Sequence, residues 1–228
     1  MQPYLVFSLT ASIGAMGELA GHERRGSLVW PARSAIIGLL GAALGTRREG
    51  DFSALNALEI DIAIFEAGAQ LRDYHTVETV PSTMVKSANS RPEALRAAGR
   101  GKTNTAITMR DYRTGVLYGV AVRGEGLEEL EAALKAPRFT LYLGRKSCPL
   151  AAPTGAHIVN AENAETALAR VAVPRWHEAP GGAVATHLVT SDPNGEIVHD
   201  IPLDRGLWHF APRRVVLRPV KIVAGVNA

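Results

Sequence analysis

The chain has 228 residues, of which 46% are hydrophobic and 21% are charged. This composition is typical of a folded globular protein and excludes a chain that is disordered throughout. The net charge of +3 allows a nucleic-acid partner without requiring one, so the distribution of the charges has to decide. The single cysteine, Cys148, excludes an intramolecular disulfide and fits a reducing cytoplasm, where we expect the protein to be located.

The apolar N-terminal segment, residues 4–16, has no basic stretch before it and is interrupted by serine, threonine and glycine. It therefore predicts a first strand and not a signal peptide. No other segment is long and apolar enough for a membrane span, so we expect no membrane contact.

Hydrophobic periodicity predicts the first elements as a strand at residues 4–9, a helix at 35–44, a short helix at 52–58 and a strand at 60–65. Ser34 stands where the N-cap of the first long helix is expected, directly after Arg33. A phosphate could meet both the Arg33 side chain and the positive end of that helix. The alternative, in which Arg33 is a loop cation that contacts only solvent, is equally consistent with the sequence.

A long irregular stretch follows, in which the charge is one-sided. Between residues 81 and 110 a single acid, Glu93, stands against six cations, which are Lys86, Arg91, Arg96, Arg100, Lys102 and Arg110. Residues 97–102 have no apolar period and are typical of a flexible tip. A solvated linker needs no such charge, so we interpret an insertion at about residues 78–112 as a protruding hairpin arm that orders on a polyanion.

The regular pattern resumes with a strand at residues 117–122, a helix at 127–136 and a strand at 139–143. Together with the earlier elements, this is the βαββαβ order of a ferredoxin-like domain, the α+β frame of RNA-recognition modules. We assign that domain to residues 1–150.

The remaining residues, 151–228, predict a small β-rich C-terminal subdomain. Its elements are a helix at residues 161–171, a hairpin turn at 192–195 and a basic last strand at 213–221. The turn is predicted because Asp-Pro-Asn-Gly combines residues that favour tight turns.

The turn after the strand at 139–143 is the candidate ligand site. Tyr142 offers a flat aromatic face, and Gly144, Arg145 and Lys146 follow within residues 136–161, which contain no acid. Aromatic stacking beside fixed positive charge is the chemistry that holds bent single-stranded RNA. A surface turn with solvated cations is the alternative.

Enzyme motifs are mostly absent. The sequence has no P-loop, nucleophile elbow or zinc-protease signature, and its seven histidines lack metal-ligand spacing, so we expect no metal and no cofactor. One catalytic possibility is that Tyr74 or His75 acts as general base on an RNA 2′-hydroxyl while Lys146 stabilises the phosphate. We favour the structural interpretation, in which Tyr74 and His75 anchor the arm.

Three blocks of the sequence resemble the CasD subunits of type I-E CRISPR Cascade complexes. They are WPARSAIIGLLGAALG at residues 30–45, LRDYHTV at 71–77 and PRFTLYLGRKSCPL at 137–150. The resemblance is strong over about residues 1–150 and weak beyond. It implies a ferredoxin-like, non-catalytic RNA-binding subunit that caps the backbone filament and grips the 5′ handle of the guide RNA (crRNA), for RNA-guided DNA targeting in antiviral defence.

The same resemblance implies the partners and the site. The partners are the crRNA handle, the CasC backbone subunits against which the arm would wedge, the CasA large subunit and, through the complex, target DNA. The positions that face the handle in the family pattern are Arg33, Arg110, Tyr142, Gly144, Arg145 and Lys146. Ser34, beside Arg33, completes the predicted RNA-binding set.

Two other functions stay open. Relatives in type I-C systems cleave the repeat RNA themselves, so the chain could be a metal-independent, repeat-specific endoribonuclease. In type I-E systems a separate subunit, CasE, cleaves the repeat, and an adjacent CasE gene would leave this chain no such task. A general single-stranded RNA-binding protein would explain the charge but not the long arm.

Overall fold

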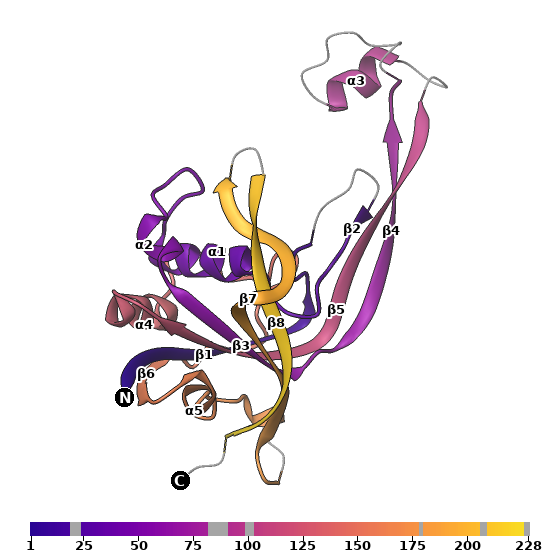
Figure 1. Ribbon diagram of the computed structural model, residues 1–228. Coiled ribbons are helices and arrows are strands. Elements are labelled where there is room, and N and C mark those ends of the chain that lie inside the picture. Colours follow the sequence, from indigo (N-terminus) through magenta and orange to yellow (C-terminus); the bar gives the residue numbers. More distant parts are fainter. Residues whose placement is uncertain (19–23, 82–90, 99–102, 178–179, 206–208, 226–228) are drawn as a thin grey trace.

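The computed structural model describes residues 1–18, 24–81, 91–98, 103–177, 180–205 and 209–225. In this part of the chain eight strands form one sheet, in which β2 and β4 pair with β5 beside the main path β6-β1-β5-β3-β7-β8 (Figure 1). The strands are β1 (Gln2–Gly14), β2 (Arg24–Arg25), β3 (Glu59–Glu66), β4 (Ala69–Thr79), β5 (Asn104–Arg123), β6 (His157–Ala161), β7 (Ala183–Asp204) and β8 (His209–Ala224). Every pairing is antiparallel except that of β2 with β5. The fold is therefore of the mixed α+β class.

Helices cover both faces of the sheet (Figure 1). They are α1 (Arg33–Leu44), α2 (Ser53–Asn56), α3 (Arg91–Ala98), α4 (Leu127–Lys135), α5 (Ala164–Leu168) and the 3-10 helix η1 (Arg175–His177). Successive residues of a strand point to opposite faces. In β1, Leu5, Phe7 and Leu9 join the core with α1 and α4, whereas Tyr4 and Val6 join the core with α5. The central strands are consequently apolar on both faces. Within the described residues, no helix combines the length and apolar character needed to cross a membrane.

Most elements predicted for the first 136 residues are present. The strands predicted at 4–9, 60–65 and 117–122 lie within β1, β3 and β5, and the two long helices are α1 and α4. The strand predicted at 139–143 is wrong, because that segment contains only an isolated bridge between Tyr142 and Pro149. The strand that pairs with the outer edge of β1 is β6. Leu143 is buried within a turn and not within the sheet, so its apolar side chain imitates one of a strand.

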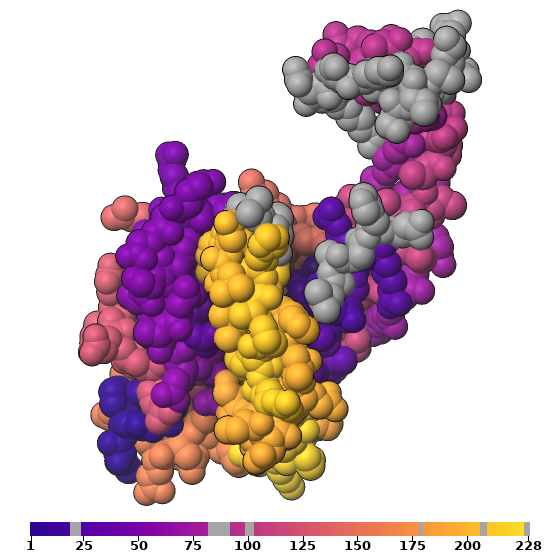
Figure 2. Space-filling model, turned by 45° about the horizontal axis from the view of Figure 1, so that its top comes forward, coloured from indigo at the N-terminus to yellow at the C-terminus, as the bar shows by residue number. Residues whose placement is uncertain are grey.

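The arm consists of β4 and the first part of β5, which project from the body with α3 beyond their far end (Figures 1 and 2). Pairing continues from Ala69 opposite Thr114 to Thr79 opposite Asn104. Part of the predicted irregular tip is wrong, since residues 97 and 98 belong to α3. Three predicted arm cations, Lys86, Arg100 and Lys102, lie outside the described residues.

Strands from residues 151–228 extend the same sheet, because β6 pairs with β1 and β7 with β3. The hairpin turn predicted at 192–195 is wrong. Both Ser191 and Glu196 lie opposite Val215, so the residues between them bulge out of β7, which then continues along β8. A Cβ at Gly195 would lie 2.1 Å from the carbonyl oxygen of Val215, which explains a glycine there. The sequence signal of a tight turn thus marks a bulge in a longer strand.

Candidate nucleic-acid interface

The candidate turn is closed by its own backbone. The amide of Leu143 donates to the carbonyl of Cys148 at 2.8 Å, and the amide of Cys148 donates to the carbonyl of Arg145 at 2.8 Å. Tyr142 and Pro149 bridge the ends of the loop. The closed loop leaves the side chain of Lys146 exposed to solvent, where it is available to an anion.

Gly144 fixes this turn against the N-terminal loop. Its φ angle is +83°, and an added Cβ would lie 1.6 Å from the carbonyl oxygen of Ala15. The amide of Ala15 donates to the carbonyl of Leu143 at 3.1 Å. Only glycine combines this backbone angle with so close an approach, so Gly144 has a steric role, and its predicted contact with RNA stays a prediction.

Arg145 lies over the aromatic ring of Tyr112, with its guanidinium carbon 4.5 Å from the ring centroid. Tyr112 belongs to β5 at the base of the arm and packs with Ala15 and the buried Cys148. Nη1 of Arg145 is buried and has no hydrogen-bond partner among the described residues. The turn, the N-terminal loop and the arm base therefore meet at this cation–π pair.

Arg110 lies on the same side of the arm base. It is two residues from Tyr112 on β5, so both side chains point to one face. Across the strands, Arg110 is opposite Arg25 of β2 and Asp73 of β4. The structure thus brings Arg110 and Arg145, both predicted to contact RNA, to one face of the arm base.

The opposite face of the arm base holds an ion cluster that sequence reasoning missed. Asp111 accepts hydrogen bonds from Nε and Nη2 of Arg72 at 2.7 and 3.1 Å, and from Nε and Nη2 of Arg24 at 3.0 and 2.8 Å. Its side chain is 2% exposed. Hydrogen bonds from Arg72 and then Arg24 lower the pKa of Asp111 to about 2. Asp111 is the only acid between Glu93 and Glu125, a signal that would have identified it.

Arg33 and Ser34 lie at the start of α1, where the side chain of Arg33 contacts backbone carbonyls of the same chain. The guanidinium of Arg33 donates to the backbone carbonyls of Asn56 at 2.8 Å and Leu58 at 2.7 Å. Burial and repulsion by Arg213 lower its pKa. Ser34 is not the N-cap as predicted, because α1 begins at Arg33 and its N-cap is Ala32.

The carboxylate of Asp200 in β7 stabilises the start of α1 instead of a serine cap. Its Oδ2 accepts from the backbone amide of Arg33 at 2.8 Å. Arg213 binds the same carboxylate with Nε at 3.0 Å and Nη2 at 2.7 Å. The first turn of α1 therefore already faces a carboxylate, which satisfies an amide that a phosphate would otherwise bind.

Tyr74 and His75, the predicted arm anchors, follow each other on β4 and so point to opposite faces. Tyr74 is 66% exposed. The His75 ring has Asp73 as a neighbour at 3.6 Å, on the same strand. Tyr74 shares a side-chain hydrogen bond with Arg72, which in turn binds Asp111, so the predicted anchor role of Tyr74 and His75 stays a prediction.

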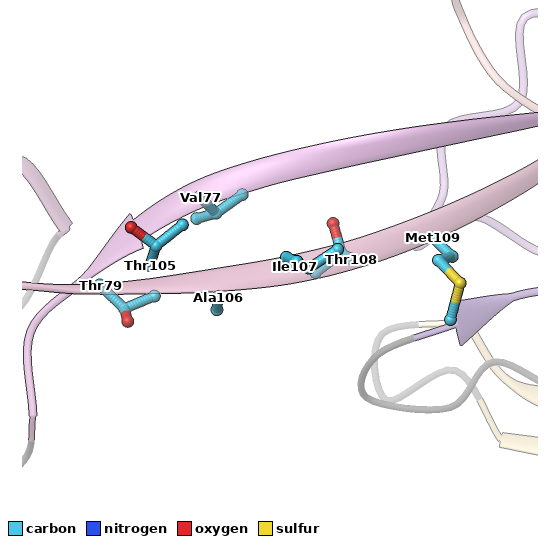
Figure 3. Close-up of a pocket in the computed structure, with 7 residues that line it drawn as sticks. All are labelled: Val77, Thr79, Thr105, Ala106, Ile107, Thr108 and Met109. Atoms are coloured by element: carbon cyan, nitrogen blue, oxygen red, sulfur yellow. The ribbon is translucent and has the colours of Figure 1, made fainter.

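Further out, the arm is hollowed into a groove of about 680 Å³ (Figure 3). It is lined by Val77, Thr79, Thr105, Ala106, Ile107, Thr108 and Met109. Among these described lining residues none carries a charged side chain. Within the described residues, no cluster of histidine, cysteine or carboxylate side chains could hold a metal ion.

Comparison with known proteins agrees with this architecture. The sequence model of the family described as CRISPR-associated protein (Cas_Cas5) matches residues 4–216. The CRISPR system Cascade subunit CasD of Escherichia coli (strain K12) is 33% identical over 170 residues, which cover 67% of this chain and 70% of that protein. A chain from a solved CRISPR RNA-guided surveillance complex has a TM-score of 0.73 at 22% identity, covering 97% of this chain and 91% of its own length. A crystal structure of a Cas protein has a TM-score of 0.66 at 26% identity, with coverage of 96% and 95%.

Proposed function

The chain belongs to the family of CRISPR-associated proteins described as Cas_Cas5, and from this premise we propose that it is a non-catalytic subunit of a Cascade-type surveillance complex that binds the 5′ handle of the crRNA. The observation that carries the proposal is the cationic face at the base of the arm. There Arg145 and Arg110 lie on one side of β5, and Lys146 is exposed on the adjoining turn. A rigid face of this kind can hold a bent single strand through its phosphates.

The strand order supports a ferredoxin-like core. The strands β6, β1, β5 and β3 are neighbours in that order and all antiparallel. Helix α1 lies between β1 and β3 in the sequence, and α4 lies between β5 and β6. In this interpretation β6 is the fourth strand, the arm is an insertion between the second and third strands, and β7 and β8 are an addition at the sheet edge.

The arm supports the proposed partners. A two-stranded projection with exposed apolar side chains, among them Ile107 at 56%, offers surface beyond what the body needs for folding. We place the neighbouring CasC backbone subunit against this arm, with the CasA large subunit and target DNA reached through the assembled complex. The relative that carries the name Cascade subunit CasD supports this assignment.

An endoribonuclease is not favoured by the geometry. Tyr74 shares the face of Arg72 and Asp111, which is opposite the face of Arg110 and the turn, and the contact of the His75 ring, at 3.6 Å, is with Asp73. General acid–base cleavage needs a base and a cation held around the same scissile bond. We therefore propose that this site binds RNA without cleaving it.

Co-purification tests the proposal. The tagged full-length chain is co-expressed with its neighbouring genes and the CRISPR array, and is expected to recover crRNA and the other subunits. Replacing Arg145 and Lys146 by alanine should reduce bound crRNA and lower the salt slope of handle binding by up to about two phosphate contacts. The control replaces two exposed cations away from the turn, Arg47 and Lys221. Equal losses in both variants, or recovery without crRNA, contradict the proposal.

A further inference from the structure

We propose that the open edge of β5 in the arm, residues 104–108, is a docking site for an extended protein segment, which adds a strand to the sheet in line with β2. This inference rests on the proposed function, in which another subunit lies against the arm, and it names the kind of segment that the arm receives. Its basis is a stretch of strand that, within the described residues, is paired on one side only and is followed by the groove of Figure 3.

The pairing of β5 changes along its length. It pairs with β1 from Arg113 to Val122, and at Met109 and Arg110 it pairs with both β4 and β2, so β2 lies on the side away from β4. In the described part of the chain, residues 104–108 pair with β4 alone. A strand directs backbone amide and carbonyl groups to both of its sides. Those on the side away from β4 therefore point to the place where a continuation of β2 would lie.

The groove runs along this open edge. Its lining takes in five consecutive residues of β5, Thr105–Met109, but only Val77 and Thr79 of β4 (Figure 3). Because successive residues of a strand point to opposite faces, a groove that meets five in a row passes along the side of the strand and not over one face. Its volume of about 680 Å³ is in the range of pockets that hold ligands.

The sequence of this edge lacks the residues that protect open edges. Charged residues and proline on an edge strand discourage the addition of another strand. Residues 104–109 are NTAITM and contain neither. Two other strands have an open edge within the described residues, and both are protected: β4 contains Arg72, Asp73 and Glu78, and β8 contains prolines, arginines and a lysine. The contrast indicates that this stretch of β5 is suited to strand addition.

The lining of the groove favours a protein segment over RNA. Its described residues carry no charge, whereas Arg110 and Arg145 lie at the base of the arm. RNA depends on cations that neutralise its phosphates, so an uncharged groove does not suit its backbone. In strand addition, backbone hydrogen bonds supply affinity and apolar surface receives alternate side chains. Val77 and Ile107, of which the second is 56% exposed, offer such surface.

Residue-level hydrogen exchange tests the added strand. The full-length chain is measured alone and in the complex obtained by co-expression with its neighbouring genes and the CRISPR array. Within residues 104–108 we expect alternate amides to exchange rapidly in the chain alone and to slow by about tenfold or more in the complex. Amides that are already slow in the chain alone, or that exchange equally fast in the complex, would overturn the inference.

A charge placed in the groove supplies a second test. Ile107→Asp should lower recovery of the neighbouring subunit by about tenfold or more, because docking would bury a carboxylate that no described lining residue compensates. The matched control is Thr76→Asp, since Thr76 is exposed on β4 opposite Ile107 and lies outside the described lining. Thermal melts show that both variants are folded. Equal recovery from the two variants would contradict the docking site.

A photoreactive side chain identifies what occupies the groove. Ile107 is replaced by benzoylphenylalanine, and irradiation of the complex is expected to crosslink the chain to a protein subunit. A crosslink to crRNA would overturn the inference. If the complex contains crRNA but the edge stays unprotected, the docking site is wrong and the proposed function stands. If a protein subunit protects the edge but no crRNA is recovered, the proposed function fails and the docking site stands.

Discussion

Asp111 and Arg72 face each other across the ladder of β4 and β5, and the Nε of Arg72 donates to the Asp111 carboxylate at 2.7 Å. Arg24 of β2 binds the same carboxylate. Three short segments, from β2, β4 and β5, are thereby joined by one buried charge. The contact therefore ties β4 and β2 to β5 at the base of the arm.

Replacing Asp111 by asparagine should loosen the arm base. The change keeps the shape but removes the charge that compensates two guanidinium groups, of which Arg24 is 54% and Arg72 34% exposed. Because solvent reaches both partners, we expect a loss of about 1–2 kcal/mol, less than for a fully buried pair. Urea unfolding measures it. The control is Asp73→Asn, whose half-exposed carboxylate should cost little, and equal losses would contradict the role assigned to Asp111.

The same carboxylate predicts a pH dependence. The folded-state pKa of Asp111, about 2, is below its ordinary value of 3.8. Ionised Asp111 therefore stabilises the fold above about pH 4, and this contribution is lost as pH falls from about 4 toward 2. The difference in unfolding free energy between wild type and Asp111→Asn should shrink over that window. A difference that is constant with pH would show that the charge contributes nothing.

Hydrophobic periodicity and charge predicted the elements whose formation depends mainly on residues close to one another in the sequence. The helices α1 and α4 and the central strands followed from periodicity, and the arm followed from its charge and its lack of an apolar face. The edge strand was misplaced because Leu143 is buried by a turn, while β6 pairs with β1 across about 150 residues of chain. Similarly, Asp192–Gly195 has the composition of a turn, and only its pairing with β8 makes it a bulge.

The sequence predicted the cations of the candidate site, but it did not predict the residues that hold their side chains in place. Arg145 and Lys146 stand out because the surrounding residues contain no acid. Tyr112 carries no mark in the sequence, since its contact with Arg145 arises only when the turn packs against the arm base. Arg33 also looked free, yet its guanidinium is bound by the carbonyls of Asn56 and Leu58. Non-local packing decides both cases.

Gly144→Ala should disrupt the candidate turn. The substitution strains a φ angle of +83° and places Cβ 1.6 Å from the carbonyl oxygen of Ala15, so the turn must separate from the N-terminal loop. Gly115→Ala is the matched control, because Gly115 has a φ angle of +65° but no atom within 4 Å of an added Cβ. We expect Gly144→Ala to lower the melting temperature further and to weaken RNA binding. Equal effects would mean that the contact with Ala15 is dispensable.

Removing the end of the arm should separate folding from assembly. Thr79 and Asn104 are opposite each other in the ladder, so a short glycine-rich turn can join them and replace residues 80–103. The body keeps both of its large cores, none of whose residues lies in the removed stretch, and its thermal melt should stay unchanged. The shortened protein should fail to join the complex in co-purification. Normal assembly with a normal guide length would refute the role of the arm.

The last prediction is that the chain does not cleave RNA. A metal-independent ribonuclease holds a base at the 2′-hydroxyl and a cation at the scissile phosphate. His75 is about half exposed, and its contact at 3.6 Å is with Asp73 on its own strand, so no described side chain directs the imidazole at the turn that carries Lys146. Repeat RNA incubated with the full-length protein in chelator should therefore stay intact, and His75→Ala should leave both melting temperature and RNA affinity near the wild-type values. Specific cleavage of the repeat that is abolished by His75→Ala or Lys146→Ala, in a protein that remains folded, would establish the endoribonuclease instead.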